Sequence, residues 1–418
     1  FPKILRNLVM KSNQSQKNNK KLLSDVCEIF SGGTPSTKNK EYWNGDIPWL
    51  SSGETRNTFI IDTEKKITEQ GVKNSSTKLA KKNDVIIASA GQGHTRGQVS
   101  LCLIDTYVNQ STIVLRSNTE RILPKYLFYN LKYRYSELRQ LSDSHSSRGS
   151  LPKNLISDIE IPVLSLIKQE KIGKILYELD LKIQNLQNQN RILEKIGQSI
   201  FKSLFINFDG ITEWDKVGKI PKGWHPTDLK NVLSLIKDGS HNPPKRVESG
   251  IPFIAGASDL KHFIVDFSNC SFITNDGYNE IHKTWKIKTN DILLTIVGTI
   301  GNVAIVRDDD PIFSLQRSIA VLRSNEKIDY AFLFFLLRSY EFEKFLYANV
   351  NRTGQPGIYL GVLGSFEFIL PPSPLIKEFS KTTKIFIYKI QKNHSSITNL
   401  KNIHSTLGPK LMSGEIRV

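Results

Sequence analysis

Two stretches of the chain carry apolar residues at alternating steps of three and four residues. The first covers 172–204 and the second covers 376–411, so each closes one half of the sequence. A seam with this spacing lies along one side of a helix and is typical of a coiled coil. The prolines at 162, 371, 372 and 374 precede the seams and suit a domain exit and a first helical turn. The pattern predicts two long helices.

The two seams are related by a constant displacement. From Phe379 onward, the second seam is the first moved by 207 residues. The first consists of Ile172, Leu176, Leu179, Ile183, Leu186, Asn190, Leu193, Gly197, Ile200 and Leu204, and the second of Ile376, Phe379, Thr383, Phe386, Ile390, Asn393, Ile397, Leu400, His404, Leu407 and Leu411.

The segments before each seam show a different pattern. Runs of β-branched residues, such as 84–88 and 291–297, are broken by Gly, Pro and Asn and predict strands. Near the end of each segment, 125–141 and 330–347 predict helices. The strand-like pieces repeat as well, because Asn83-Asp84-Val85-Ile86 returns as Asn290-Asp291-Ile292-Leu293, again 207 residues later. The chain is therefore two copies of one unit.

This organisation predicts an α+β fold, with two mixed α/β domains in tandem and two long helices. We expect a basic tail (1–21), a first globular domain (22–162), a central helix (163–208), a second globular domain (209–371) and a C-terminal helix (372–418). Two similar units on one chain favour a pseudo-twofold arrangement, in which the long helices form an antiparallel coiled coil. About 40 residues at ~1.5 Å each give a rod of roughly 60 Å. One turn of B-DNA spans roughly 34–36 Å, so such a rod suits a bipartite target.

An antiparallel pairing can be tested for consistency within the seams. If Asn190 faces Asn393, then Leu186 meets Ile397, Leu193 meets Ile390, Gly197 meets Phe386 and Leu179 meets His404. A polar layer in an apolar seam lowers stability but fixes register and orientation. We therefore predict that Asn190 and Asn393 set the coiled-coil register; the alternative is two unrelated polar positions near water.

Charge points to the class of partner. The chain has 57 Lys and Arg against 40 Asp and Glu, a formal net charge of +17. Such an excess favours a polyanion as the binding partner, with a lysine-rich but otherwise ordinary surface as the alternative.

The three cysteines are far apart and none lies in a metal-binding pattern, which predicts an intracellular, cytoplasmic protein without a metal site. No apolar run reaches membrane-spanning length, so we expect no membrane partner.

The tripeptide Asn242-Pro243-Pro244 raises the possibility of an adenine methyltransferase. That chemistry needs an aromatic residue next, to stack on the flipped base, but Lys245 follows. Neither a glycine-rich cofactor turn nor a GxxxxGK[ST] phosphate loop is present in the sequence. We interpret the tripeptide as a turn and expect no catalytic residues and no bound cofactor.

Direct DNA readout needs Arg, Lys, Asn, Gln or Ser on loops or helix ends that reach base edges, with further cations on phosphates. Loops that combine such residues with glycine or proline occur in both copies, and a solvated loop is the alternative for each. The DNA-binding candidates are Ser36, Thr37, Lys38, Gln92, His94, Arg96 and Arg148 in the first copy, and Ser240, His241, Asn242, Lys245, Arg246, Arg317, Arg352 and Gln355 in the second. Trp49 and Phe253 follow Ile-Pro at corresponding places and are predicted to be core.

Several short motifs occur in a fixed order and in both copies of the unit, and together they resemble the specificity subunit of a type I restriction-modification system. They are Ser31-Gly32-Gly33-Thr34-Pro35-Ser36, Ile47-Pro48-Trp49-Leu50, Ile220-Pro221-Lys222-Gly223-Trp224, Asp238-Gly239-Ser240-His241, Ile251-Pro252-Phe253-Ile254, Thr353-Gly354-Gln355 and Leu370-Pro371-Pro372. The resemblance covers nearly the whole chain, but no IPxGW opening precedes Leu22.

The resemblance implies two target-recognition domains that each read half of an interrupted, asymmetric DNA sequence. It also implies that the helices set the gap and bind two methyltransferase subunits, which restriction/translocase subunits then join. S-adenosylmethionine, ATP and Mg²⁺ would then belong to partner subunits. Three alternatives stay open: a specificity subunit of a type IIB-like enzyme, a free-standing nuclease or methyltransferase, and a coiled-coil scaffold.

Overall fold

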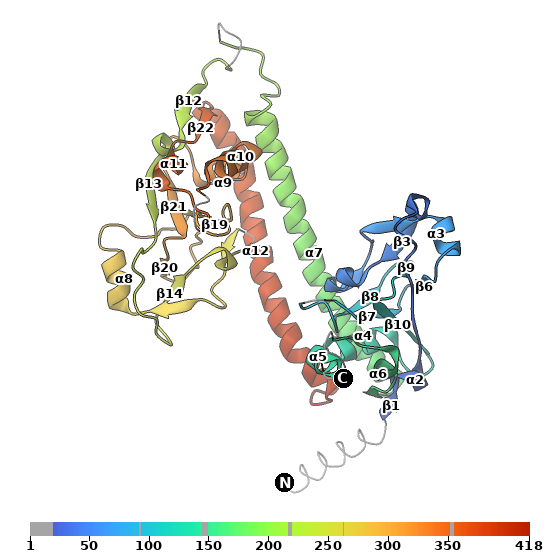
Figure 1. The fold of residues 1–418 in the computed structure, drawn as a ribbon. Coiled ribbons are helices and arrows are strands. Elements are labelled where there is room, and N and C mark those ends of the chain that lie inside the picture. Colours follow the sequence, from blue (N-terminus) through green and yellow to red (C-terminus); the bar gives the residue numbers. More distant parts are fainter. Residues whose placement is uncertain (1–19, 92, 144–148, 216–219, 262, 352–354) are drawn as a thin grey trace. The chain divides into compact units, whose positions relative to one another are not determined.

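The computed structural model describes residues 20–91, 93–143, 149–215, 220–261, 263–351 and 355–418. The chain divides into two compact units. Unit 1 combines the chain up to Gln184 with Asn399–Val418, and unit 2 is Asn185–Thr398. Each unit therefore contains one globular domain and one end of each long helix (Figure 1).

The domain of unit 1 is built on two sheets, with strand orders β2-β10-β7-β8-β4 and β5-β3-β9-β6. The strands are β2 (Cys27–Ser31), β3 (Trp43–Leu50), β4 (Phe59–Ile60), β5 (Lys65–Ile67), β6 (Lys78–Ala80), β7 (Val85–Ala88), β8 (Val99–Cys102), β9 (Thr106–Val108) and β10 (Thr112–Ser117). The helices are α2 (Leu23–Val26), α3 (Glu69–Lys73), α4 (Pro124–Lys132), α5 (Tyr135–Asp143) and α6 (Lys153–Ser157).

The domain of unit 2 repeats this plan with one strand fewer in each of the two sheets, in the orders β13-β21-β18-β19 and β17-β14-β20. The strands are β13 (Leu233–Asp238), β14 (Ile251–Ile254), β15 (Leu260–Lys261), β16 (Ile264–Val265), β17 (Ser271–Ile273), β18 (Ile292–Thr295), β19 (Val303–Ile305), β20 (Ser314–Leu315) and β21 (Ile319–Ser324). The helices are α8 (Asn275–Ile281), α9 (Tyr330–Leu336), α10 (Tyr340–Asn349) and α11 (Leu360–Gly364).

The continuous apolar runs of the sequence are strands that are covered on both faces. In β7, Val85 and Ile87 belong to one hydrophobic cluster and Ile86 to another. In β18, Ile292 and Leu294 face one cluster and Leu293 faces the other. Because successive side chains of a strand point to opposite faces, burial on both sides removes the polar alternation.

The repeat extends to individual contacts. Arg116 Nη2 lies 2.8 Å from Asp84 Oδ2 in unit 1, and Arg323 Nε lies 2.7 Å from Asp291 Oδ1 in unit 2. The asparagine before each aspartate has a positive φ, 76° at Asn83 and 69° at Asn290. Each residue of the second ion pair, and Asn290, lies 207 residues after its counterpart in unit 1. The shared displacement therefore reflects two copies of one fold.

Each domain begins and ends at one two-stranded sheet. In unit 1, β1 (Lys20–Leu22) pairs antiparallel with β11 (Glu160–Pro162). In unit 2, β12 (His225–Asp228) pairs in the same way with β22 (Glu367–Leu370). The long helices follow at once, as α7 (Leu166–Phe205) and α12 (Ser373–Met412), each of 40 residues. In Figure 1 they are the green and the red helix.

Within unit 2 the two helices run antiparallel. Asn393 Nδ2 donates to Asn190 Oδ1 at 2.8 Å, and Asn190 Nδ2 lies 3.4 Å from the Ile390 carbonyl oxygen. Nearer the end of α7, the Phe205 and Phe379 rings meet edge to face with centroids 5.1 Å apart. One expected layer differs. The atoms nearest to a Cβ placed on Gly197 belong to Phe335 of α9, not to Phe386.

Within unit 1 the helix ends are joined by a polar cluster. Asp180 on α7 accepts hydrogen bonds from Tyr129 and Lys132 of α4 at 2.9 and 3.0 Å, and lies 3.4 Å from His404 on α12. Burial alone would raise the pKa of the Asp180 carboxyl, but the hydrogen bonds and charges of His404 and Lys132 outweigh it and lower that pKa. The carboxylate therefore ties both helices to the domain.

The Asn190–Asn393 contact generates a prediction about register. Asn393→Leu alone should lower the free energy of unfolding by roughly 1–3 kcal/mol, because it leaves the Asn190 amide without its partner. The double change Asn190→Leu with Asn393→Leu should recover that loss and let the helices slip. Urea unfolding measures the first effect, and disulfide trapping between cysteine pairs placed along α7 and α12 measures the second. A trapping pattern that is the same in the double variant and the wild type would refute the register role.

Candidate nucleic-acid interface

A glycine turn begins the candidate site in each unit. A Cβ on Gly32 would lie 1.9 Å from the Val108 carbonyl oxygen, and a Cβ on Gly239 would lie 2.2 Å from that of Leu315. The backbone of β9 or β20 is thus so close that only glycine fits. The next residue in each copy donates its N–H to the same carbonyl, Gly33 at 3.1 Å and Ser240 at 2.8 Å. The loops 32–38 and 239–246 are therefore held at corresponding edges of their domains.

A second turn lies beside the first and joins it to the central strands. In unit 1 it is 109–111, where the Ser111 carbonyl accepts the Ser89 N–H at 2.9 Å. In unit 2 it is 316–318, where the Ser318 carbonyl accepts the Ile296 N–H at 2.8 Å. The backbone connection is the same in both copies.

A third pair of loops completes each edge. These loops include the turns that follow β7 and β18, at 89–98 and 296–302. In each unit, one backbone hydrogen bond joins this turn to a loop later in the chain. Leu151 N–H donates to the Ser89 carbonyl at 2.8 Å, and Ile358 N–H donates to the Ile296 carbonyl at 2.9 Å. We call the described residues of these loops the polar rim: 32–38, 89–91, 93–98, 109–111 and 149–151 in unit 1, and 239–246, 296–302, 316–318 and 355–358 in unit 2.

The structure places most of the sequence-predicted residues on these rims. Ser36, Thr37, Lys38 and His94 are exposed in unit 1; His241, Asn242, Lys245, Arg246, Arg317 and Gln355 are exposed in unit 2, and Ser240 is half-buried. Gln92, Arg148 and Arg352 lie outside the described residues. Trp49 and Phe253 are buried, as predicted for core residues.

Arg96 differs from its expectation. Its side chain is only 10% exposed, ion-paired with Asp143 and hydrogen-bonded to the Gly149 carbonyl at 3.0 Å. The sequence suggested a side chain that reaches DNA, but in this conformation the guanidinium is turned inward. The physical reason is that a buried charge needs a partner, and α5 with the loop after it supplies one. This placement argues against direct base contact by Arg96.

The loop around Arg96 is fixed from the same side. The Tyr135 hydroxyl donates to the His94 carbonyl at 2.8 Å, and Arg139 Nη1 donates to the Gly93 carbonyl at 2.8 Å. Both donors are on or at the start of α5. The backbone of this loop is therefore held by side chains of α5, and the His94 side chain is exposed at its surface.

Two candidates of unit 2 have partners in their own loop or in the strands beside it. His241 Nε2 lies 2.7 Å from Asp238 Oδ2, and the Arg246 guanidinium lies 3.9 Å from the centroid of the Phe253 ring. Partial burial lowers the pKa of the Arg246 guanidinium. Arg246 also donates to the Pro244 carbonyl at 3.2 Å. The Asn-Pro-Pro segment is thus part of an exposed loop braced by Arg246.

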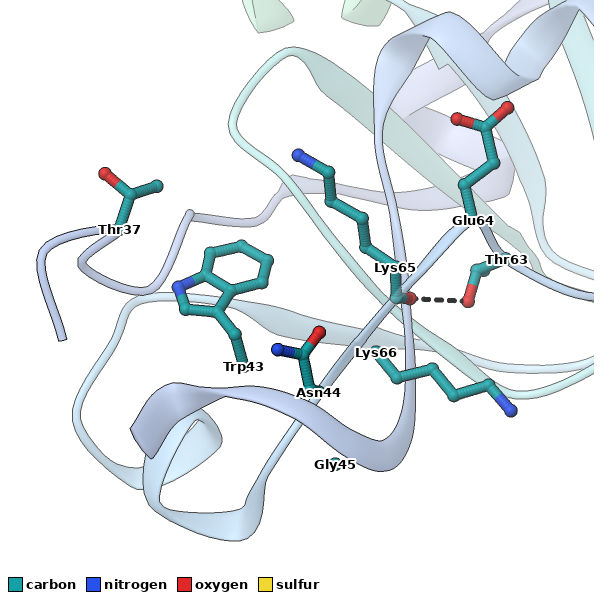
Figure 2. A pocket seen from close by; sticks show the side chains of 8 residues that line it. All are labelled: Thr37, Trp43, Asn44, Gly45, Thr63, Glu64, Lys65 and Lys66. Carbon is teal, nitrogen blue, oxygen red and sulfur yellow. Dashed lines mark hydrogen bonds between the residues drawn. The ribbon is translucent and has the colours of Figure 1, made fainter. Parts of the chain in front are cut away.

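Unit 1 has a cavity of about 470 Å³ next to its first loop, shown in Figure 2. Trp43 forms one wall; its indole N–H donates to the Ser36 carbonyl at 3.2 Å, which ties the cavity to the rim. Thr37, Asn44 and Lys65 also line it, and Asn44 has a φ of 61°. Lys65 and Lys66 point in opposite directions from β5, as strand neighbours do. The cavity combines an aromatic ring, amide and hydroxyl groups, two lysines and the carboxylate of Glu64.

Two further observations concern metal sites and membrane-spanning helices. Among the described residues, no group of three or more His, Cys, Asp or Glu side chains is arranged to hold a metal ion. In the same part of the chain, every helix is too short or too polar to cross a bilayer.

Comparison with known proteins agrees with this architecture. Residues 16–195 and 221–402 each match the type I restriction modification DNA specificity domain. The type I restriction enzyme MjaIX specificity subunit of Methanocaldococcus jannaschii is 30% identical over 95% of this chain and 93% of its own length. The MjaVIII specificity subunit of the same organism is 26% identical over 95% and 92%.

A solved structure supports the fold. The type I restriction-modification S subunit from M. genitalium has a TM-score of 0.65 at 18% identity and covers 94% of this chain and 95% of its own. Because the family model matches both halves of the sequence and the MjaIX subunit is similar over nearly the whole chain, the chain belongs to the family of type I restriction-modification specificity subunits. The expected α+β class, with two tandem domains and paired long helices, is confirmed.

Sequence reasoning missed one residue of the rim and three residues of the cavity beside it. Gln110 is exposed on the turn 109–111, 207 residues before Arg317, so applying the repeat to that arginine would have found it. Trp43, Asn44 and Lys65 carried no such signal. They meet because β3 departs from regular pairing with β5 between Trp43 and Ile47, which sequence does not reveal.

The contacts of Arg96 predict a structural effect on mutation. Arg96→Ala should lower the free energy of unfolding by roughly 1–3 kcal/mol, because it leaves the Gly149 carbonyl without its donor and Asp143 without its cation. Urea unfolding measures the loss. Arg56→Ala is the matched control: its ion pair with Glu64 is exposed, at 59% for both side chains, so stability should change by less than about 0.5 kcal/mol. Unchanged stability of Arg96→Ala, with relaxed recognition of one half-site, would restore the base-contact interpretation.

Proposed function

We propose that this chain is the DNA-specificity subunit of a type I complex in which each domain reads one half of an interrupted target. The observation that carries the proposal is the polar rim. Both units hold the same three turns with the same backbone hydrogen bonds, yet the side chains at their tips differ. A shared scaffold with different tips is what two unequal half-sites require. The asymmetry of the target follows from the divergence of the copies.

Charge supports DNA as the ligand. A net charge of +17 favours a polyanion, and neutralised phosphates release counterions that make binding strongly dependent on salt. Lys38 and Lys65 in unit 1 and Lys245 in unit 2 are exposed at or beside the rims. In this proposal such lysines position the duplex, while amide, hydroxyl and guanidinium groups at the tips read bases.

The long helices supply the second part of the proposal. Outside the seam positions, both helices carry large apolar residues that are exposed. The exposed fractions are 57% for Ile192 and 42% for Ile196 on α7, and 65% for Ile385 and 61% for Tyr388 on α12. Large apolar side chains on a solvent face favour a protein partner. We assign these faces to two methyltransferase subunits, to which restriction/translocase subunits are added.

The subunit itself performs no catalysis in this proposal. S-adenosylmethionine, ATP and Mg²⁺ act on the partner subunits. The Asn242-Pro243-Pro244 loop supports this assignment, because Lys245 is exposed where a base-stacking aromatic would be needed, and the nearby aromatic ring of Phe253 is fully buried beneath Arg246.

Mapping of methylated adenines in the native genome tests the proposal. Deleting the gene should abolish methylation at one interrupted, asymmetric motif on both strands and leave all other motifs unchanged. Restoring the wild-type chain should restore that motif. A methylome that stays the same after deletion contradicts the proposal.

The docking faces give a separate prediction. Ile192→Glu with Ile196→Glu should weaken capture of the methyltransferase subunits by at least about tenfold, because two charges replace buried apolar contacts. Co-purification and analytical ultracentrifugation with purified subunits measure this. The control is Gln187→Glu with Gln198→Glu, which adds the same charge at polar positions of α7 that lie roughly 120–140° around the helix from Ile192. Equal capture by both variants would exclude this face of α7.

A further inference from the structure

The second rim turn presents one exposed side chain at the same position of each unit. That residue is Gln110 in unit 1 and Arg317 in unit 2, 207 residues apart. The residue before each donates its N–H to the end of a buried strand, Asn109 to Leu50 at 3.1 Å and Gln316 to Ile254 at 2.9 Å. The residue after each tip, Ser111 or Ser318, accepts a hydrogen bond at its carbonyl from the turn that follows β7 or β18. Both tips are therefore held rigidly between two other segments of their domains.

Arg317 is available to a ligand in a way that neighbouring arginines are not. Its backbone N–H donates to the Ser240 carbonyl at 3.1 Å, but no side chain or carbonyl of the described residues hydrogen-bonds its guanidinium. The other described arginines of its domain are engaged: Arg246 with Phe253 and Pro244, and the remainder in the ion pairs Arg307–Asp310, Arg323–Asp291 and Arg338–Glu194. Among the described arginines of this domain, Arg317 is thus the one whose guanidinium donors remain unused, on a backbone held by hydrogen bonds to neighbouring segments.

Gln110 is oriented by a neighbour on the first rim loop. The Thr34 hydroxyl donates a hydrogen bond to Gln110 Oε1, and the Gln110 side chain is otherwise exposed. A carboxamide oxygen has two lone pairs, so one acceptor position and both amide N–H donors remain. The unit 1 turn therefore presents a preset donor-acceptor pair where unit 2 presents a fork of donors.

These two patterns match different bases. In the major groove, adenine shows an acceptor beside a donor, which Gln matches with both groups, whereas guanine shows two acceptors, which Arg matches with two donors. We propose that 110 and 317 are corresponding specificity-determining positions, with Gln110 reading adenine in the first half-site and Arg317 reading guanine in the second. The inference rests on the proposed function and adds to it which residue reads which base.

Reciprocal exchange of the two residues tests the assignment. The full chain, as wild type, Arg317→Gln or Gln110→Arg, is used to select binders from duplexes randomised over the whole site. Arg317→Gln should change one position of one half-site from guanine to adenine, and Gln110→Arg should change one position of the other half-site from adenine to guanine. At the changed position, preference should shift by about 5- to 150-fold, and every other position should stay as in the wild type.

A matched control separates base contact from loss of charge. Lys381→Gln removes one exposed cation from α12, outside the rim, and should leave the selected motif intact. Uniformly weaker binding of Arg317→Gln, with the slope of log affinity against log salt reduced by about 0.9, would mark a phosphate contact and overturn the inference. A motif unchanged in both exchange variants overturns the inference alone. A wild-type chain that selects no interrupted motif overturns the proposed function, and the inference with it.

Discussion

Neither globular domain completes its core with residues from its own half of the sequence alone. Phe201 and Phe205, from the end of α7, belong to the hydrophobic cluster of the second domain. Leu411, from the end of α12, belongs to that of the first domain, beside Ile172 and Leu176. Burial of each such side chain is worth roughly 1.5–3 kcal/mol, so the exchange of helix ends is part of what makes each domain stable. The ends of the two long helices are therefore a condition for the folding of each domain.

The two helix ends meet their domains through different chemistry. In unit 2, Gly197 lies against the Phe335 ring, and the layer is apolar. In unit 1, the corresponding helix position is His404, which lies beside Tyr133, with Nδ1 2.9 Å from its hydroxyl, and beside the Asp180 carboxylate. A buried polar cluster tolerates fewer alternative partners than an apolar one, because any mismatch leaves a group unsatisfied. The copies thus share a fold but not an interchangeable contact.

Much of the architecture could be predicted from the sequence because it depends on periodicity. The seams predicted both long helices and the meeting of Asn190 with Asn393, and the displacement of 207 residues predicted two domains of one kind. The rim was less accessible. Arg96 looked like a free loop cation because its partners, Asp143 and Gly149, are about 50 residues away in sequence. Gly197 was paired with the wrong phenylalanine because a heptad pattern describes only helix-to-helix contacts and not a third helix, α9.

The short sheets β1·β11 and β12·β22 bring the entry and exit of each globular domain side by side. Because its two ends lie together, each domain could be exchanged as one unit without lengthening the chain that connects it to the helices. In the proposed function, this architecture would separate the two quantities that define an interrupted target. Recombination at the borders of a domain would change the bases that are read, whereas insertion or deletion of helical turns would change their spacing.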